Sequence, residues 1–184
     1  DANNTYSLAR RIPFIRINAK RKYPVEIIVS IDRLKEIRLL ENANLTVEKI
    51  STEKVSFFSE SSGKLHIEDI AASKLNVIHT GSGDIVLKGK NLREINAKVS
   101  GNGNLIASDL VVERATLTHQ GRGMVHLAPS TWLDARMLNN GNLFLHSTPF
   151  DLVIDQQGTG KVKDILPEAK AIYDLNATKP ALQN

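Results

Sequence analysis

The sequence predicts an all-β fold, a single-stranded parallel β-helix (a solenoid) with coils of about 20 residues and a short C-terminal cap. Two observations carry this prediction. Glycine turns recur at a nearly constant spacing along the chain. After each of them, apolar residues alternate with polar ones in the same register, which is the pattern of a short strand with one buried face.

The glycine repeat sets the length of the predicted coil. Gly-x-Gly occurs at 81–83, 101–103 and 121–123, each 20 residues after the one before, and again at 158–160. Asn140-Gly141 fills the gap at a slightly shorter spacing, and Ser62-Gly63 lies 20 residues before Gly83. Of the 11 glycines only Gly89 lies elsewhere, so the following are expected to be structural turn residues: Gly63, Gly81, Gly83, Gly101, Gly103, Gly121, Gly123, Gly141, Gly158 and Gly160.

Each glycine turn is followed by two strand patterns separated by a corner. The first places these pairs inward: Leu65/Ile67, Ile85/Leu87, Leu105/Ala107, Val125/Leu127 and Leu143/Leu145. The second, about twelve residues after each glycine, places these pairs inward: Leu75/Val77, Ile95/Ala97, Ala115/Leu117, Ala135/Met137 and Leu152/Ile154. Such a unit cannot bury its own apolar face, so stacked coils are expected to share one core.

Two physical reasons place glycine at the turns. A sharp bend needs a positive φ, which glycine adopts without a Cβ penalty. Stacked coils also bring turn against turn, where a residue without a side chain fits best. Equivalent strands of successive coils run the same way, so the sheets are expected to be parallel, and the crossover rule favours right-handed coiling.

Other repeat folds fit less well. The glycines and the two-residue period exclude a helical repeat, the consensus of a leucine-rich repeat is absent, and a propeller blade needs about 40 residues. An antiparallel sandwich stays open as the alternative, because regular short strands with turns also fit it.

The ends of the chain are less regular. Residues 11–19, 25–31, 37–40, 45–47 and 55–58 read as further strands, and 42–45 as a degenerate turn one coil before Gly63. Pro167 could open a short helix that runs to about Asp174 and caps the last coil. The expected division is an extension at 1–11, the β-helix at 12–162, and a cap and tail at 163–184.

The composition of the chain excludes several kinds of structure and chemistry. The chain contains no Cys, which excludes disulfides, thiolate-bound metals and a thiol nucleophile, and no apolar run is long enough to span a membrane as a helix.

The net charge of +4 arises from the segment at residues 10–22. Without this segment the count is 18 basic against 20 acidic residues. This segment could contact an anionic surface, or be a solvated strand and loop. Its basic residues are Arg10, Arg11, Arg16, Lys20, Arg21 and Lys22.

Nucleic-acid binding is not expected, because the aromatic residues near this segment, Phe14 and Tyr23, lack the spacing of a base-stacking surface. No catalytic, metal or cofactor site is expected either. His79 and His119 share one repeat position two coils apart, about 9.6 Å, which is too far for one metal ion. His146 stands alone, and the histidines read as surface or turn residues.

Three other features could carry function. Asp69 and Asp109 read as equivalent corners with Gly89 between them, but the tight coils leave no insertion to build a polysaccharide cleft. Trp132 could stack on a sugar or pack into a corner. A ridge of turn residues could recognise a glycan or a protein, or be merely solvated: Ser82, Asn102, Arg122, Asn140 and Thr159.

The glycine segments carry a family resemblance. Residues 79–85 (HTGSGDI) and 99–105 (VSGNGNL), with the lead-in at 25–29 and 34–37, resemble the putative auto-transporter adhesin head GIN domain. The resemblance covers roughly residues 12–162. The chain departs from the pattern at Arg122, at the single glycine of the 139–141 turn, and in its tail.

The resemblance implies a β-helical, exported, bacterial cell-envelope protein, and it brings no catalytic residues. We therefore expect a non-enzymatic binding, adhesion or structural module located in the periplasm, at the outer membrane or outside the cell, its targeting segment removed. Its partner would be an envelope protein or a glycan, and self-association is possible. The alternatives are a polysaccharide-acting β-helical lyase or hydrolase, and a self-assembling envelope scaffold.

Overall fold

The computed structural model describes residues 14–17 and 34–164, and in this part of the chain every regular element is a β-strand. The strands are β1 (Phe14–Ile17), β2 (Glu36–Leu39), β3 (Leu45–Val47), β4 (Ile50–Ser59), β5 (Leu65–His79), β6 (Ile85–Val99), β7 (Leu105–His119), β8 (Val125–Met137), β9 (Leu143–Leu145), β10 (Asp151–Gln156) and β11 (Val162–Asp164).

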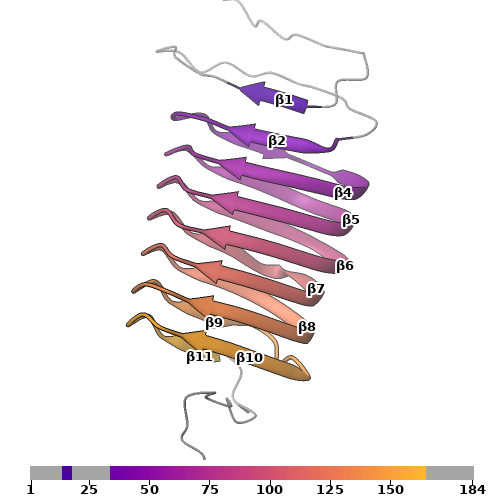
Figure 1. Cartoon of the computed structure of the whole chain (residues 1–184). Coiled ribbons are helices and arrows are strands. Elements are labelled where there is room, and N and C mark those ends of the chain that lie inside the picture. Colours follow the sequence, from indigo (N-terminus) through magenta and orange to yellow (C-terminus); the bar gives the residue numbers. More distant parts are fainter. Residues whose placement is uncertain (1–13, 18–33, 165–184) are drawn as a thin grey trace, which may run out of the picture.

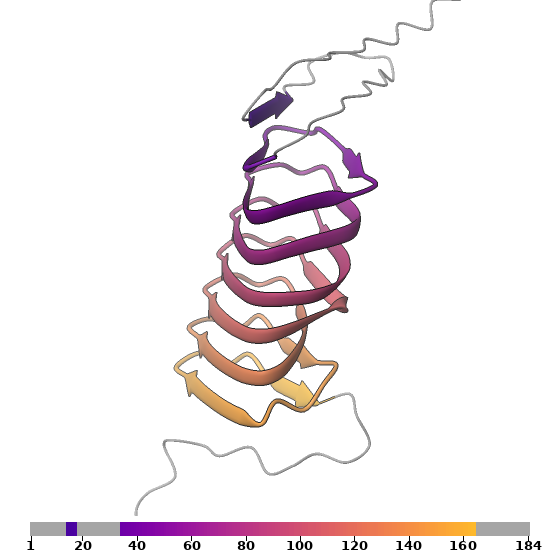
Figure 2. The same cartoon turned by 90° about the vertical axis from the view of Figure 1, so that its right-hand side faces the viewer.

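The strand pairings in the described part of the chain are all parallel, and each strand pairs with its equivalent in the next coil. The main path runs β1-β2-β4-β5-β6-β7-β8-β9-β11, with β3 beside β5 and β10 beside β8. Figure 1 shows these strands stacked along one axis, and Figure 2 shows the same stack of coils from the side. The predicted parallel β-helix is confirmed, and the antiparallel alternative is excluded.

The full coils are each one long bent strand. β5, β6 and β7 contain 15 residues each, so the two predicted strands and the corner between them form a continuous element. Leu65 pairs with Ile85, which pairs with Leu105, so one sequence repeat is one coil. The register shifts only at the corners, as between Ile67 and Ile70.

One continuous core runs along the axis of the stack. The inward pairs expected from the alternation are all buried except at the last coil, where Leu152 is only half-buried. Leu65, Ile85 and Leu105 are fully buried one above another. Burying a side chain of this size contributes about 1.5–3 kcal/mol, so the shared core accounts for a stack of coils that could not fold singly.

Close packing, not backbone conformation, explains the turn glycines. A Cβ atom on Gly83 would lie 1.8 Å from the carbonyl oxygen of Gly63, and one on Gly103 would lie 1.9 Å from that of Gly83. Among the described glycines only Gly89, at a corner bulge, has a positive φ, of 156°. The expectation that the turns need a positive φ was therefore wrong, because each turn instead stacks directly on the turn before it.

The N-terminal coils follow the expected strands. The pattern at 11–19 contains β1, that at 37–40 corresponds to β2, that at 45–47 is β3, and that at 55–58 lies within β4. The 42–45 turn takes the place of a glycine turn, since the backbone N–H of Lys64 donates to Oδ1 of Asn44 over 2.7 Å. The strand expected at 25–31 and the helix expected from Pro167 lie outside the described residues.

Candidate functional site

The exposed side of each glycine turn forms one continuous ridge. The turn N–H groups donate to carbonyls of the preceding turn, as Gly103 does to Gly81 over 3.1 Å and Gly141 to Gly121 over 3.2 Å. The side chains between and beside the glycines are therefore carried outward in line. All five predicted ridge residues are exposed: Ser82, Asn102, Arg122, Asn140 and Thr159.

A ladder of Asn and Asp side chains runs beside this ridge. Oδ1 of Asp84 accepts the backbone N–H of Asn104 at 3.1 Å, and Oδ1 of Asn104 accepts that of Met124 at 2.7 Å. Oδ1 of Asn142 accepts the N–H of Lys161 in the same way, at 2.8 Å. The ladder ties neighbouring coils together. Sequence reasoning missed it, although Asn or Asp directly after the glycine was a visible signal.

Trp132 lies on an outward face built from β7, β8 and β10. Its register partners are Arg114 on one side and Asp151 on the other, and Asp134 follows two residues later on the same face. Within residues 14–17 and 34–164, the side chains of these four residues form no hydrogen bond or ion pair. An aromatic ring is thus flanked by polar groups that are available to a ligand.

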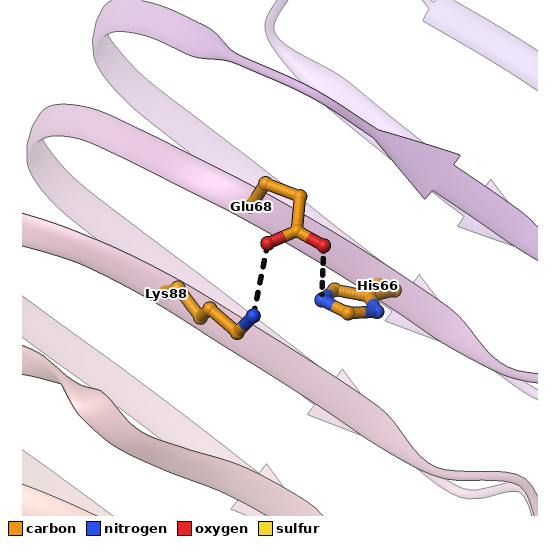
Figure 3. Close-up of polar contacts among 3 residues, drawn as sticks. All are labelled: His66, Glu68 and Lys88. Atoms are coloured by element: carbon orange, nitrogen blue, oxygen red, sulfur yellow. Dashed lines mark hydrogen bonds and ion pairs between the residues drawn. The ribbon is translucent and has the colours of Figure 1, made fainter.

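Charges on the earlier coils neutralise one another instead. Nζ of Lys74 lies 2.9 Å from Oε2 of Glu94. Figure 3 shows a second cluster, in which the Glu68 carboxylate contacts Nζ of Lys88 and Nε2 of His66, each at 2.9 Å. The hydrogen bond from Lys88 lowers the pKa of Glu68, and the nearby His66 lowers it further.

Two of the histidines that read as surface or turn residues are buried. The side chains of His79 and His119 are 0% and 1% exposed. Both residues belong to one register column, which also contains Ser59, Val99 and Met137. Nε2 of His119 lies 2.9 Å from the carbonyl oxygen of Gly123. Burial lowers the pKa of His79, against a smaller opposing effect of the Ser59 carbonyl. Of the two readings of these residues, the surface one was wrong, because the glycines make room for the rings. Both residues do lie next to a turn, at the ends of β5 and β7.

His146 is not alone, as the sequence had suggested. Its Nε2 lies 2.9 Å from Nδ1 of His126 on the preceding coil. The His126 ring also stacks on Phe144, with centroids 4.7 Å apart and planes 13° apart. Both histidines are half-buried, His126 near the start of β8 and His146 directly after β9. Burial lowers the pKa of His126, and the neighbouring His146 lowers it further.

The two carboxylates considered for polysaccharide cleavage do not converge. Gly89 pairs with Ile70 and Leu110, not with Asp69 and Asp109 as expected, because the corners contain bulges. Asp109 is the register partner of Lys88, and Asp69 lies 3.8 Å from Nζ of Lys49. Among the described residues, no three His, Asp or Glu side chains gather closely enough to hold a metal ion.

The basic segment lies almost wholly outside the described residues. Only Arg16 falls within them, in β1, where its backbone is the register partner of Arg38. Arg10, Arg11, Lys20, Arg21 and Lys22 are not described. No helix in the described part is long and apolar enough to cross a membrane.

Comparisons with known proteins agree with this architecture. A family model described as "Putative auto-transporter adhesin, head GIN domain" matches residues 8–149. Among solved structures, the chain is similar to a putative adhesin from Bacteroides fragilis, with a TM-score of 0.62 and 20% identity over 80% of this chain and 71% of that one. At that identity the likeness shows the fold alone. No curated protein matches the chain.

Proposed function

This chain belongs to the putative auto-transporter adhesin, head GIN domain family, and we propose that it is a non-catalytic module, exported to the cell envelope, that binds a surface glycan. Family membership supports a protein of the cell surface or of an exported compartment. The observation that carries the choice of ligand is the Trp132 face of β7, β8 and β10.

The chemistry of this face suits a sugar ring. An aromatic side chain offers a flat apolar surface, against which the C–H face of a pyranose can stack. Hydroxyl groups at the ring edge need donors and acceptors that are not already satisfied. Arg114 and Asp151 flank Trp132 in register, about 4.8 Å away on either side, and have no partner among the described side chains.

The shape of the coils favours binding over cleavage. Each described coil contains about 20 residues or slightly fewer, so within residues 34–164 no long insertion between strands could close over a substrate. Polysaccharide cleavage needs converging acidic and basic groups within a cleft. Asp69 instead lies beside Lys49, and Asp109 is in register with Lys88.

Fluorescence offers a direct test, because Trp132 is the only tryptophan in the chain. Titration of the full chain with a panel of purified bacterial and host oligosaccharides should change its emission for the ligand class that binds. Trp132→Ala should abolish capture of that ligand on an immobilised glycan array. Phe58→Ala is the matched control, since Phe58 is a half-buried aromatic residue on the same side of the coils, in β4.

The two variants and the products of the reaction mixture distinguish three outcomes. Loss of binding in the Trp132 variant with retention in the Phe58 variant supports the proposal. Equal binding by both variants would place the ligand elsewhere on the molecule, and shortened oligosaccharides in the reaction mixture would show that the chain is an enzyme.

A further inference from the structure

The pair formed by His126 and His146 is held in place from both sides. The backbone N–H of His146 donates to the carbonyl oxygen of Leu127 over 2.8 Å, which fixes the start of its side chain. The His126 ring is held by its stack on Phe144. The two imidazoles are thus held next to each other, with Nδ1 of His126 and Nε2 of His146 2.9 Å apart.

A shortened coil sets the diagonal geometry of this pair. The turn glycines Gly123 and Gly141 are closer together in the sequence than Gly103 and Gly123 by two residues, so His126 has Phe144 as its register partner. His146 comes two residues later and therefore points to the same outward face, diagonally beside His126. In the full-length coils, the partner of the equivalent His66 is Val86, and no second imidazole adjoins it within the described residues.

The separation of the two nitrogens is close to that of two adjacent ligands of one metal ion. Imidazole nitrogens bind Zn²⁺ at about 2.0–2.1 Å, which puts neighbouring ligand nitrogens roughly 3.0–3.4 Å apart. The two nitrogens now face each other along the line between the ring centroids, which are 5.2 Å apart. For both lone pairs to point at one ion, the nitrogens would have to separate by a few tenths of an ångström and each ring would have to turn. The ion would take the place of the single proton between the two nitrogens, and that proton would move to the far nitrogen of its own ring, so both imidazoles stay neutral.

We propose that His126 and His146 form a two-histidine surface site for a divalent transition-metal ion. Two neutral imidazoles favour ions that prefer nitrogen ligands, with Cu²⁺ bound most tightly and Ni²⁺ and Zn²⁺ less so, and they give no site for Ca²⁺ or Mg²⁺. The remaining coordination positions are open to water.

Nuclear magnetic resonance on the full chain tests the site directly. Cu²⁺ added at well below one equivalent should broaden the imidazole signals of His126 and His146 first, and leave those of His66 sharp. His66 is the internal control, since it lies in the same outward column but contacts Glu68 instead of a second histidine.

Substitutions then measure how much each histidine contributes to the affinity for Cu²⁺. His126→Gln and His146→Gln should each weaken Cu²⁺ binding at least tenfold by calorimetry, whereas His66→Gln should leave it unchanged. Circular dichroism of each variant checks that the fold is retained. Equal broadening of the His66, His126 and His146 signals, or unchanged affinity in both folded variants, would overturn the proposal.

Discussion

The imidazole of His119 packs against Gly141 on the next coil so closely that a methyl group at position 141 would not fit. A Cβ atom at position 141 would lie 2.1 Å from Nε2 of His119 and 2.6 Å from the carbonyl oxygen of Gly123. The same relationship holds between His79 and Gly103, where the Cβ atom would lie 2.6 Å from Nε2 of the imidazole. The glycine turns therefore house buried imidazoles as well as stacking on one another.

Gly141→Ala should destabilise the protein by about 3 kcal/mol, because the new methyl group must displace a packed ring. Part of this loss should be recovered in the His119→Ala background, where the ring is gone. A double-mutant cycle by urea unfolding should give a coupling free energy of about 1 kcal/mol or more. Additive losses would show that the ring and the glycine do not compete for space.

Gly83→Ala should destabilise at least as strongly as Gly141→Ala, but with no rescue by changes at nearby side chains. Its Cβ atom would lie 1.8 Å from the carbonyl oxygen of Gly63, which is backbone and cannot rotate away. Asn102→Ala, on the exposed ridge between two glycines, is the control and should stay within about 0.5 kcal/mol of the wild type.

Stability should fall in mild acid because His79 is buried as a neutral ring. Burial lowers its pKa in the folded state, so between the usual imidazole value of about 6.5 and that lowered value the unfolded chain binds a proton that the folded chain does not. The free energy of unfolding should therefore decrease as pH falls through this window, by at most about 1.4 kcal/mol per pH unit for one proton. Well above the usual imidazole value the residue should contribute no pH dependence.

His79→Val should flatten that profile in urea titrations run from mild acid to just above neutral pH. Valine suits the position, because Val99 fills the equivalent place in the next coil. Nε2 of His79 has no hydrogen-bond partner among the described residues. The Ser59 carbonyl near Nδ1 also accepts the N–H groups of Thr80 and Gly81, so removal of the ring leaves no group newly unsatisfied. A variant with the same slope as the wild type would assign the acid sensitivity to other groups.

The repeating parts of the fold were predictable, because each rests on a local rule. The spacing of Gly83, Gly103 and Gly123 set the coil length, and alternation such as Leu65/Ile67 set the inward face. The main reason for the glycines, the stacking of turn on turn, was expected from the repeat and not from the sequence of any one turn. It depends on contact between neighbouring turns, which stacked backbones make and an isolated turn does not.

The histidines were harder to place for two different reasons. The column of His79 and His119 also contains Leu39, Val99 and Met137, so its apolar members were an overlooked sign of burial. His126 and His146 are separated in the sequence by one full repeat, as equivalent residues of two full coils would be. The two missing residues of the shortened coil shift His146 to a diagonal position, so comparison of equivalent repeat positions did not pair them.

The pKa of Glu68 should rise when Lys88 is replaced by Met. The Lys88 ammonium group donates to Oε2 over 2.9 Å and is the main cause of the lowered pKa of this carboxyl group. Carbon-detected NMR titration of the side chain should show the value moving toward the ordinary one of about 4.3. Lys74→Met, which removes the partner of Glu94 instead, should leave Glu68 unchanged.

Charge reversal in the basic segment should weaken attachment to anionic surfaces. Replacing Arg21 and Lys22 with Glu changes the net charge by four units in a segment that holds six basic residues and no acid. Exposed charges act over roughly 10 Å at 0.1 M salt, so the effect should be large at low salt and small at high salt. The doubly substituted chain should therefore leave a column of sulfated polysaccharide at a lower salt concentration than the wild type.

A second double variant separates local from total charge. Lys54→Glu with Lys98→Glu makes the same change at two exposed positions on the stacked coils, where neither lysine has a partner among the described residues. If the segment makes the contact, this chain should elute close to the wild type, because its basic cluster is intact. Equal shifts in both double variants would mean that retention on the polysaccharide column depends on the total charge of the chain. The segment would then have no special role in binding.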